Sequence, residues 1–226
     1  MCRGEYGLPS VPAAKRNVLR EERGLNSAMS VSVILAHPRS DSFNHAIAST
    51  CVAALEASGH NVHFHDLYAE RFDCVLPFGE FSRDIILPAD IERHCSKIST
   101  ASGIVIIHPN WWGQPPAILK GWIDRVIRPG VAYEFIEGDQ GEGVPRGLLN
   151  ARSVTVFNTS NTDAARERAV FGDPLELIWK NCIFHLCGIR DVYRRTFSIV
   201  ATSTETERQT WLAEVSRIIT ERHPNA

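Results

Sequence analysis

The sequence lacks the features that mark several large classes of protein. No apolar stretch approaches the roughly 18 residues that a membrane-spanning helix needs. The 24 basic and 26 acidic residues give a formal net charge of −2. This near-neutral balance excludes the basic surface of a nucleic-acid-binding protein and the strongly acidic surface of a dedicated electron shuttle. We therefore expect no nucleic-acid partner and no membrane span.

Metal-binding and disulfide patterns are also missing. No Cys-x-x-Cys pair and no His-x-x-x-His spacing occurs anywhere in the chain. The six cysteines are Cys2, Cys51, Cys74, Cys95, Cys182 and Cys187. This distribution predicts reduced, mostly buried thiols in a cytoplasmic protein, and no metal site.

The first 28 residues differ from the rest of the chain. They carry five basic residues, three acidic residues, two prolines and three glycines, without a steady apolar period. They also lack the apolar core of 7–15 residues that a secretory signal requires. We predict a flexible arm over residues 1–28 and one domain over residues 29–226, with Met29 as an alternative start of translation.

Strands and helices alternate after Met29. Short β-branched runs predict strands at residues 31–36, 61–66, 103–107, 153–158 and 191–196. Longer amphipathic segments between them predict helices at residues 43–58, 89–99, 117–127, 174–186 and 205–222. This order is typical of βαβ units with right-handed crossovers, and so of an α/β protein with a parallel sheet.

Two strand-to-helix turns carry candidate ligand-binding residues. The strand at 103–107 leads into the sequence Pro-Asn-Trp-Trp-Gly-Gln-Pro-Pro at residues 109–116, which offers aromatic faces on a loop stiffened by prolines. The first strand leads into residues 37–44, where Ser42 can cap the next helix and the helix start attracts anions. Asp41 would repel a phosphate there, so we expect it to face solvent. In one doubly wound arrangement these turns are neighbours.

At this point the chain resembles the flavodoxin-like NAD(P)H:quinone oxidoreductases, which include DT-diaphorase-type enzymes and smaller bacterial relatives. The matching pieces occur in the family's order: Leu35-Ala36-His37, Ser42-Phe43-Asn44, Pro109, Trp112, the run from Pro116 to Trp122, Ala132-Tyr133 and Cys187-Gly188. The resemblance implies a flavodoxin-like doubly wound sandwich with a five-stranded parallel sheet ordered 2-1-3-4-5. It also implies bound FAD or FMN, NADH or NADPH as co-substrate, a quinone-like acceptor, and a homodimer with the active site at its interface.

The resemblance assigns binding roles to residues, although it assigns no catalytic residue. The flavin phosphate end would be held by His37, Ser42, Phe43 and Asn44. The isoalloxazine ring would be flanked by Pro109, Asn110, Trp111 and Trp112. The ring's polar edge would meet Asn158, Thr159, Ser160 and Asn161. The substrate side would be lined by Tyr133, with Phe135 nearby.

This chain departs from the family pattern at several of these places. Relatives often read Thr-Thr-Gly-Gly where this chain has residues 158–161. A tyrosine and a histidine that assist the flavin in the animal enzymes align with Ala165 and Phe171, so that assistance is absent or supplied otherwise. Phe135 stands where those enzymes have a tyrosine.

Three functions follow from these observations. The first is a flavin-dependent NAD(P)H oxidoreductase that passes a hydride from the nicotinamide through the flavin to a quinone-like acceptor. The second is a flavin-bearing ancillary or regulatory subunit of a transporter, as some bacterial relatives are. The third is a flavodoxin-type electron carrier, which the near-neutral charge and the Trp-Trp loop disfavour.

Overall fold

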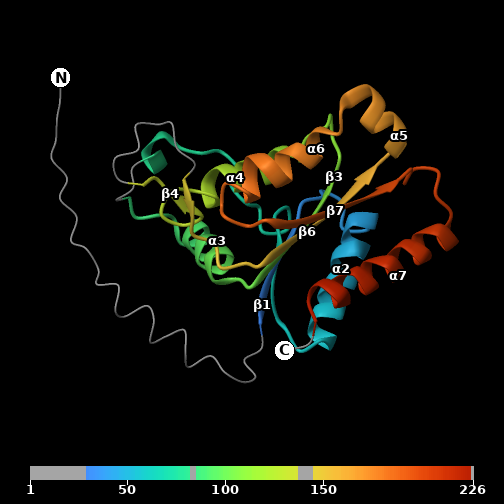
Figure 1. The fold of residues 1–226 in the computed structure, drawn as a ribbon, viewed down its shortest axis with the longest axis horizontal. Helices are drawn as coiled ribbons and strands as arrows, with labels where there is room; N and C mark the ends of the chain where they lie inside the picture. Colours follow the sequence, from blue (N-terminus) through green and yellow to red (C-terminus); the bar gives the residue numbers. More distant parts are fainter. Residues whose placement is uncertain (1–28, 82–84, 137–144, 225–226) are drawn as a thin grey trace.

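A five-stranded parallel sheet forms the centre of the protein (Figure 1). The computed structural model describes residues 29–81, 85–136 and 145–224, so the predicted arm at 1–28 lies outside the described residues. The strands in chain order are β1 (Ser30–Leu35), β2 (Asn61–Asp66), β3 (Gly103–Pro109), β6 (Ser153–Ser160) and β7 (Asp191–Ser198). Their spatial order is β2-β1-β3-β6-β7, which confirms the predicted flavodoxin-like order 2-1-3-4-5.

The burial of each strand follows its place in the sheet. Every residue of β3 and β6 is buried, because helices cover both faces of these central strands. The edge strands β2 and β7 include exposed and half-buried residues. The sequence reflects this difference in part, since β3 carries the continuous apolar run 103–107, whereas the edge strands have mixed sequences.

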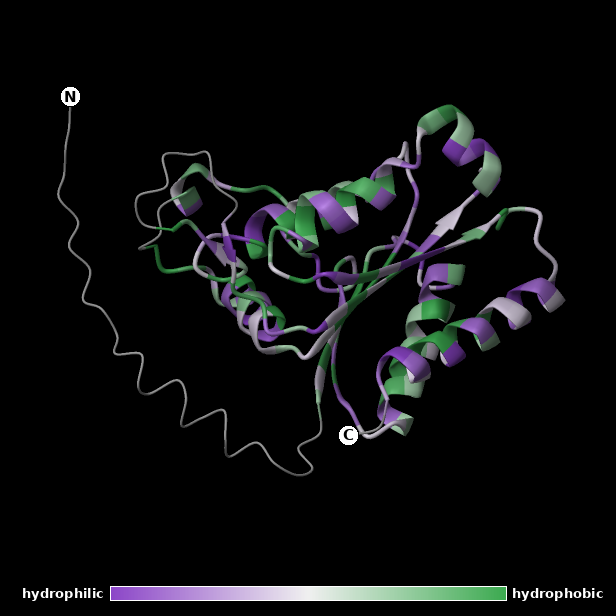
Figure 2. Ribbon diagram, viewed as in Figure 1, coloured by the Kyte–Doolittle hydropathy of each residue, from purple (hydrophilic) through white to green (hydrophobic). Residues whose placement is uncertain are grey.

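Helices cover both faces of the sheet (Figures 1 and 2). On one face, α2 (Phe43–Ala57) and α7 (Glu205–Arg222) pack together over a core that includes Ile47, Leu55 and Ile219. On the other face, the core includes residues of α3 (Ala89–Thr100), α4 (Ala117–Val126), α6 (Pro174–Leu177) and η3 (Ile178–Phe184). Among the described residues, no helix is both long and apolar enough to cross a bilayer.

A buried ion pair fixes the irregular segment after β2 to α4. Glu80, in the 3₁₀ turn η1 (Phe78–Phe81), accepts from Nε of Arg125 at 3.1 Å. Both side chains are almost fully buried, and Nη1 of Arg125 also donates to the carbonyl of Asp73. A buried charge pair with further hydrogen bonds holds a segment in one place. This cluster orders part of the irregular chain between β2 and α3.

Several short elements were not predicted. After α4, the strands β4 (Tyr133–Glu134) and β5 (Arg146–Gly147) form a hairpin, while residues 137–144 lie outside the described part. The chain after β6 forms α5 (Ala164–Arg166) and the π-helical turn η2 (Glu167–Phe171), neither of which buries a residue. Without a buried apolar face these elements leave no periodic signal. The five described cysteines are free thiols, as the sequence predicts.

Candidate functional site

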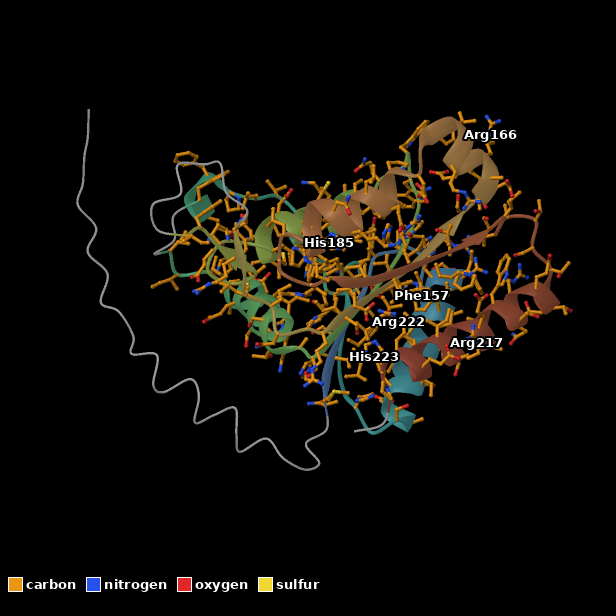
Figure 3. All side chains as sticks on the ribbon, in the orientation of Figure 1. Phe157, Arg166, His185, Arg217, Arg222 and His223 are labelled. Atoms are coloured by element: carbon orange, nitrogen blue, oxygen red, sulfur yellow. The ribbon has the colours of Figure 1, made fainter. Side chains whose placement is uncertain are left out.

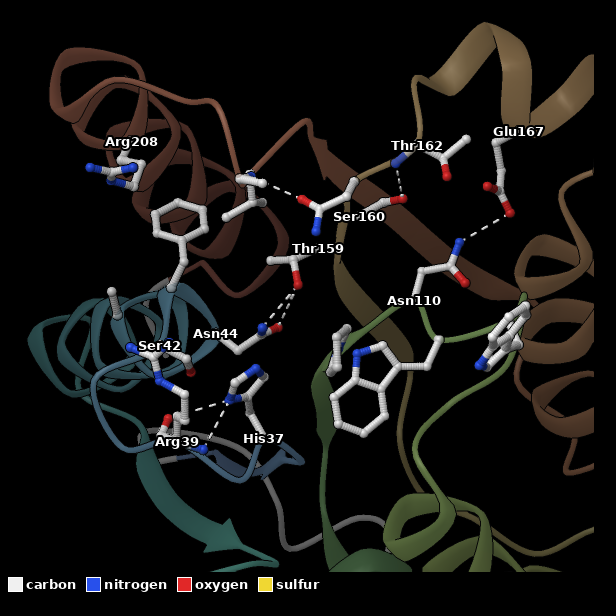
Figure 4. A pocket seen from close by; sticks show the side chains of 18 of the residues that line it. His37, Arg39, Ser42, Asn44, Asn110, Thr159, Ser160, Thr162, Glu167 and Arg208 are labelled. Carbon is white, nitrogen blue, oxygen red and sulfur yellow. Dashed lines mark hydrogen bonds between the residues drawn. The ribbon is translucent and has the colours of Figure 1, made fainter.

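A cavity of about 1180 Å³ opens where β1, β3 and β6 end (Figure 4). This is the edge at which parallel sheets of this kind bind ligands, beside the point where strand order reverses. All residues predicted to contact a cofactor line this cavity except Asn158. The structure therefore brings together three turns that are widely separated in the sequence.

The first turn presents the start of α2 to the cavity. Ser42 caps the helix, because its Oγ accepts from the N–H of His45. Nε2 of His45 donates to Asp66 at 3.0 Å, so Nδ1 is left as an acceptor for the Ser42 hydroxyl at 2.9 Å. With that hydroxyl engaged, the backbone N–H groups of Phe43 and Asn44 are the donors that the helix offers to an anion.

His37 and the residues after it form the rim of this turn. The N–H of Arg39 donates to Nδ1 of His37 at 3.1 Å, which leaves Nε2 as the ring's donor. Partial burial lowers the pKa of His37, so the ring is neutral near pH 7. Arg39 forms a two-point ion pair with Asp41, whose side chain is 74% exposed. Asp41 thus faces solvent as expected, and its charge is compensated.

The second turn is a tight hairpin that carries the two tryptophans. Backbone hydrogen bonds join Trp111 and Gln114 in both directions, at 3.1 and 3.0 Å. The two central residues, Trp112 and Gly113, have φ values of 59° and 70°, as in a type I′ turn. A Cβ on Gly113 would lie 2.7 Å from Cγ of Pro174, so glycine is required there.

The two indoles have different surroundings. Trp111 is 42% exposed and its ring lies 6.2 Å from that of His37. Trp112 is 99% exposed, because the turn points its side chain away from the protein. Within one chain, Trp111 is therefore the aromatic wall of the cavity, and Trp112 stands at its mouth.

The third turn is tied to the other two. Nδ2 of Asn44 donates to Oγ1 of Thr159 at 2.9 Å, and the N–H of Asn110 donates to the carbonyl of Thr159 at 2.7 Å. Oδ1 of Asn161 accepts from the N–H of Ala201, in the loop before α7. These contacts fix the walls of the cavity relative to one another (Figure 4).

Asn158 lies behind the cavity, which corrects the expectation that it lines it. Its side chain is fully buried. β6 continues to Ser160, so Asn158 sits inside the sheet opposite His108 of β3 and bonds to that side chain. Its Oδ1 accepts from Nη1 of Arg194.

Tyr133 and Phe135 are also absent from the lining of this cavity, against expectation. They follow α4, which starts beside the cavity at Ala117 and leads the chain away from it. Their rings contact each other edge to face at 5.7 Å, and Phe135 is 49% exposed. Their place on the substrate side therefore stays a prediction.

Some lining residues were missed by sequence reasoning. They are Glu167 from η2, Val200 and Ala201 from the loop after β7, and Glu205, Arg208, Gln209 and Leu212 from α7. Phe171 of η2, which the resemblance aligned with a flavin-assisting histidine, also lines the cavity. A capping box joins Thr204 to Glu207 and marks the start of α7. The box was readable from the sequence, whereas nothing in the sequence places Glu167 at the cavity.

A second cluster, away from the cavity, joins His65, Glu70 and His94. Glu70 accepts from Nδ1 of His65 at 3.0 Å and from Nε2 of His94 at 2.9 Å. Trp122 donates to Nδ1 of His94, so the proton of that ring is on Nε2, where a metal would have to bind. The cluster was not apparent from sequence spacing, and its hydrogen bonds describe a structural link between β2 and α3 rather than a metal site.

Comparison with known proteins gives a family. Residues 29–219 match the family described as having a flavodoxin-like fold. The chain is 38% identical over 165 residues to an uncharacterized NAD(P)H oxidoreductase of Haemophilus influenzae, covering 71% of this chain and 79% of that protein. The chain belongs to this flavodoxin-like family.

Other members extend the comparison. The human ribosyldihydronicotinamide dehydrogenase [quinone] is 27% identical over 208 residues, with 83% of this chain and 89% of that protein covered. The solved structure of Smu.1420 from Streptococcus mutans UA159 is 31% identical, with a TM-score of 0.74 and coverage of 85% of this chain and all of that one. The relatives of this chain are thus NAD(P)H dehydrogenase (quinone)-type oxidoreductases. An FMN-dependent NADH-azoreductase of Bacillus anthracis, solved in complex with FMN, shares the fold at 16% identity with a TM-score of 0.70, over 86% of this chain and 99% of that one.

Proposed function

We propose that this protein is a flavin-dependent NAD(P)H oxidoreductase that passes a hydride from NADH or NADPH to a quinone-like acceptor. One observation carries the proposal: a helix start suited to phosphate and an aromatic loop suited to a flat ring line a single preformed cavity. A flavin has both parts in one molecule. The family relationship supports the same activity.

The residues that line the cavity support a flavin lying along it. The N-terminus of α2 and Nε2 of His37 are donors for the phosphate end. Trp111 supplies a wall for the ring. The cavity continues past the α2 terminus to Arg208 and Leu212 of α7, which gives room for a further group. We therefore propose FAD rather than the shorter FMN as the cofactor.

The protein's contribution to the chemistry is to bind, orient and stabilise charge. A bound flavin supplies hydride acceptance and hydride donation. Oγ of Ser160 accepts from the N–H of Thr162, so its own proton is free to be donated into the cavity. Such a donor stabilises negative charge that builds up at the polar edge of a ring. Trp112, at the mouth, offers an apolar face to an incoming acceptor.

We also propose a homodimer in which Tyr133 and Phe135 of one copy cover the cavity of the other. The family resemblance implies such an arrangement, and it would give these two side chains the substrate-side position that they lack in one chain. The side chains of Trp112, Phe135 and Phe171 are exposed in one chain and are therefore available to such a contact. Light scattering should give the mass of two chains, and Phe135→Glu should yield single chains.

The experiment that tests the proposed activity follows two steps separately: reduction of the flavin by the nicotinamide, and reoxidation of the flavin by the quinone. Protein loaded with flavin is mixed anaerobically with NADH or NADPH, and the absorbance band of oxidised flavin is followed. We expect the band to bleach and then to return when a quinone is added in the absence of free nicotinamide. Failure of both nicotinamides to bleach the band would overturn the proposal.

A further inference from the structure

The charges that line the cavity leave one carboxylate uncompensated. Arg39 is paired with Asp41, and Arg208 contacts Glu205 at 3.2 Å. Each of these pairs is neutral in sum. Glu167 also lines the cavity, and no cation of residues 29–81, 85–136 or 145–224 forms an ion pair with it. The lining therefore carries one net negative charge, and that charge is on Glu167.

The position of Glu167 is set by a neighbouring side chain. Oδ1 of Asn110 accepts from the N–H of Gly113 at 2.9 Å, which fixes the orientation of the Asn110 amide. Its Nδ2 then donates to Oε1 of Glu167 at 3.0 Å. Glu167 is half-buried, and its Oε2 has no hydrogen-bond partner in the part of the chain that the structure describes. One carboxylate oxygen thus remains available at the cavity.

Glu167 lies at the end of the cavity away from the phosphate side. In Figure 4 it is seen beside Asn110, while Arg208 and Ser42 lie across the view. Two arginines, Arg166 and Arg168, flank Glu167 in the sequence, but neither lines the cavity. Figure 3 shows Arg166 at the outer edge of this segment. The negative charge of Glu167 consequently lies next to the aromatic loop, where the flavin ring and the acceptor would be placed.

We infer that Glu167 determines which acceptors this enzyme takes, by disfavouring acceptors that carry a negative charge near the reacting ring. This inference rests on the proposed function. A fixed carboxylate in a partly desolvated site repels an anion more strongly than it would in water, and it repels a neutral ring very little. The favoured acceptor class is therefore neutral quinones, with sulfonated or carboxylated ones disfavoured.

The test compares a neutral naphthoquinone with its sulfonated derivative. Glu167→Gln removes the charge but keeps an oxygen that accepts from Asn110. We expect the ratio of kcat/KM for the sulfonated to the neutral acceptor to rise about 3- to 10-fold in this variant, and the effect to shrink with added salt. Glu167→Asp keeps the charge, so its ratio should stay near that of the wild type.

A binding measurement complements the kinetics. Naphthalene sulfonate cannot be reduced, and its affinity for the flavin-loaded oxidised protein can be titrated by flavin absorbance. Glu167→Gln should tighten this binding by a similar factor. The control is Glu56→Gln, which makes the same change of charge on an exposed residue near the other end of α2 and should alter neither readout.

The outcomes separate this inference from the proposed function. If the wild type reduces both acceptors and the ratio is unchanged in Glu167→Gln, the role of Glu167 is overturned while the activity stands. If Glu167→Asp raises the ratio as much as Glu167→Gln, the shape of this side chain rather than its charge determines the preference between the two acceptors. The inference is then equally overturned. If the wild type reduces neither acceptor, the proposed function itself is wrong.

Discussion

The side-chain amide of Asn158 donates to Nε2 of His108 at 2.8 Å, and this bond joins the two strands whose ends carry the candidate site. Trp179 donates to the same nitrogen at 3.0 Å. Nδ1 of His108 donates in turn to the carbonyl of Pro109 at 2.8 Å. The ring is fully buried, and of these three partners the Asn158 amide has a second bond, to the backbone carbonyl of His108 at 3.4 Å. The ends of β3 and β6, where the second and third turns of the site begin, are thereby held in one position relative to each other.

Replacing His108 should cost much of the protein's stability. His108→Leu fills a similar space but leaves the Asn158 amide, the Trp179 indole N–H and the Pro109 carbonyl without this partner. Buried polar groups without partners are expensive, so we expect a loss of about 2–5 kcal/mol in the free energy of unfolding. Urea denaturation measures it. His63→Leu, on the edge strand β2, is the control, and an equal loss in both variants would contradict the account.

Acid should destabilise the protein before most carboxylates titrate. Burial lowers the pKa of His108 and of His223 to about 4, from an ordinary value of 6.5. Between these pH values the unfolded chain binds protons that the folded protein does not, so stability falls as pH falls from 6.5 to 4. The slope is up to about 1.4 kcal/mol per pH unit for each histidine. Urea denaturation across this pH range measures it.

The contribution of His223 can be isolated. Its side chain is buried against Gly103 and makes no side-chain hydrogen bond in the described structure, so His223→Leu removes its titration with little other loss. In this variant we expect the free energy of unfolding to fall clearly less steeply with pH between 6.5 and 4.5. Below pH 4.5, Glu70 adds a separate loss, because its hydrogen-bonded carboxylate has a pKa of about 2. An unchanged slope in the upper range would show that His223 is not buried as a neutral group.

The fold could be predicted from the sequence because its signals are local and repeated. The five strands and the helix starts at Phe43, Ala89, Ala117 and Glu205 agree with the predicted ranges to within a residue or two. Apolar runs and capping residues are sufficient for this. Among the elements that were missed, α5 and η2 bury no side chain and so leave no periodic pattern.

The candidate site was only partly predictable, since part of it depends on distant contacts. Residues next to a strand end, such as Ser42 and Trp111, could be placed by their position in the chain. Asn158 was misplaced because its burial depends on His108, fifty residues away. Glu167 was missed because its place at the cavity depends on Asn110, and no local pattern encodes that contact.

Gly121 of α4 should not tolerate alanine, although alanine favours helices. A Cβ at this position would overlap the backbone of Cys74, which crosses the helix there. The clash should outweigh the gain of about 1 kcal/mol in helix propensity, giving a net loss of stability. Thermal unfolding of Gly121→Ala tests this. Gly79→Ala is the control, since its Cβ would meet only Ile85 Cδ1 at 3.6 Å. A stabilised Gly121→Ala protein would be inconsistent with this packing.

The two tryptophans should have separable roles. Trp111→Ala removes the wall of the cavity, and loss of one aromatic stacking contact is worth about 1–3 kcal/mol, so flavin affinity should fall roughly 5- to 150-fold. Trp112→Ala should mainly raise the KM for the acceptor, because this indole is 99% exposed at the mouth. Flavin titration of the apoprotein and steady-state kinetics measure the two effects. The reverse pattern would mean that Trp112 holds the flavin.

The most direct test of the account is the identity of the cofactor in protein purified from cells. The protein should be yellow and should release, on denaturation, one non-covalently bound flavin per chain. Mass spectrometry of the released molecule should give the mass of FAD, in keeping with the room between the α2 terminus and α7. The mass of FMN would contradict the proposed extent of the site. A colourless protein that binds neither flavin on reconstitution would contradict its central claim.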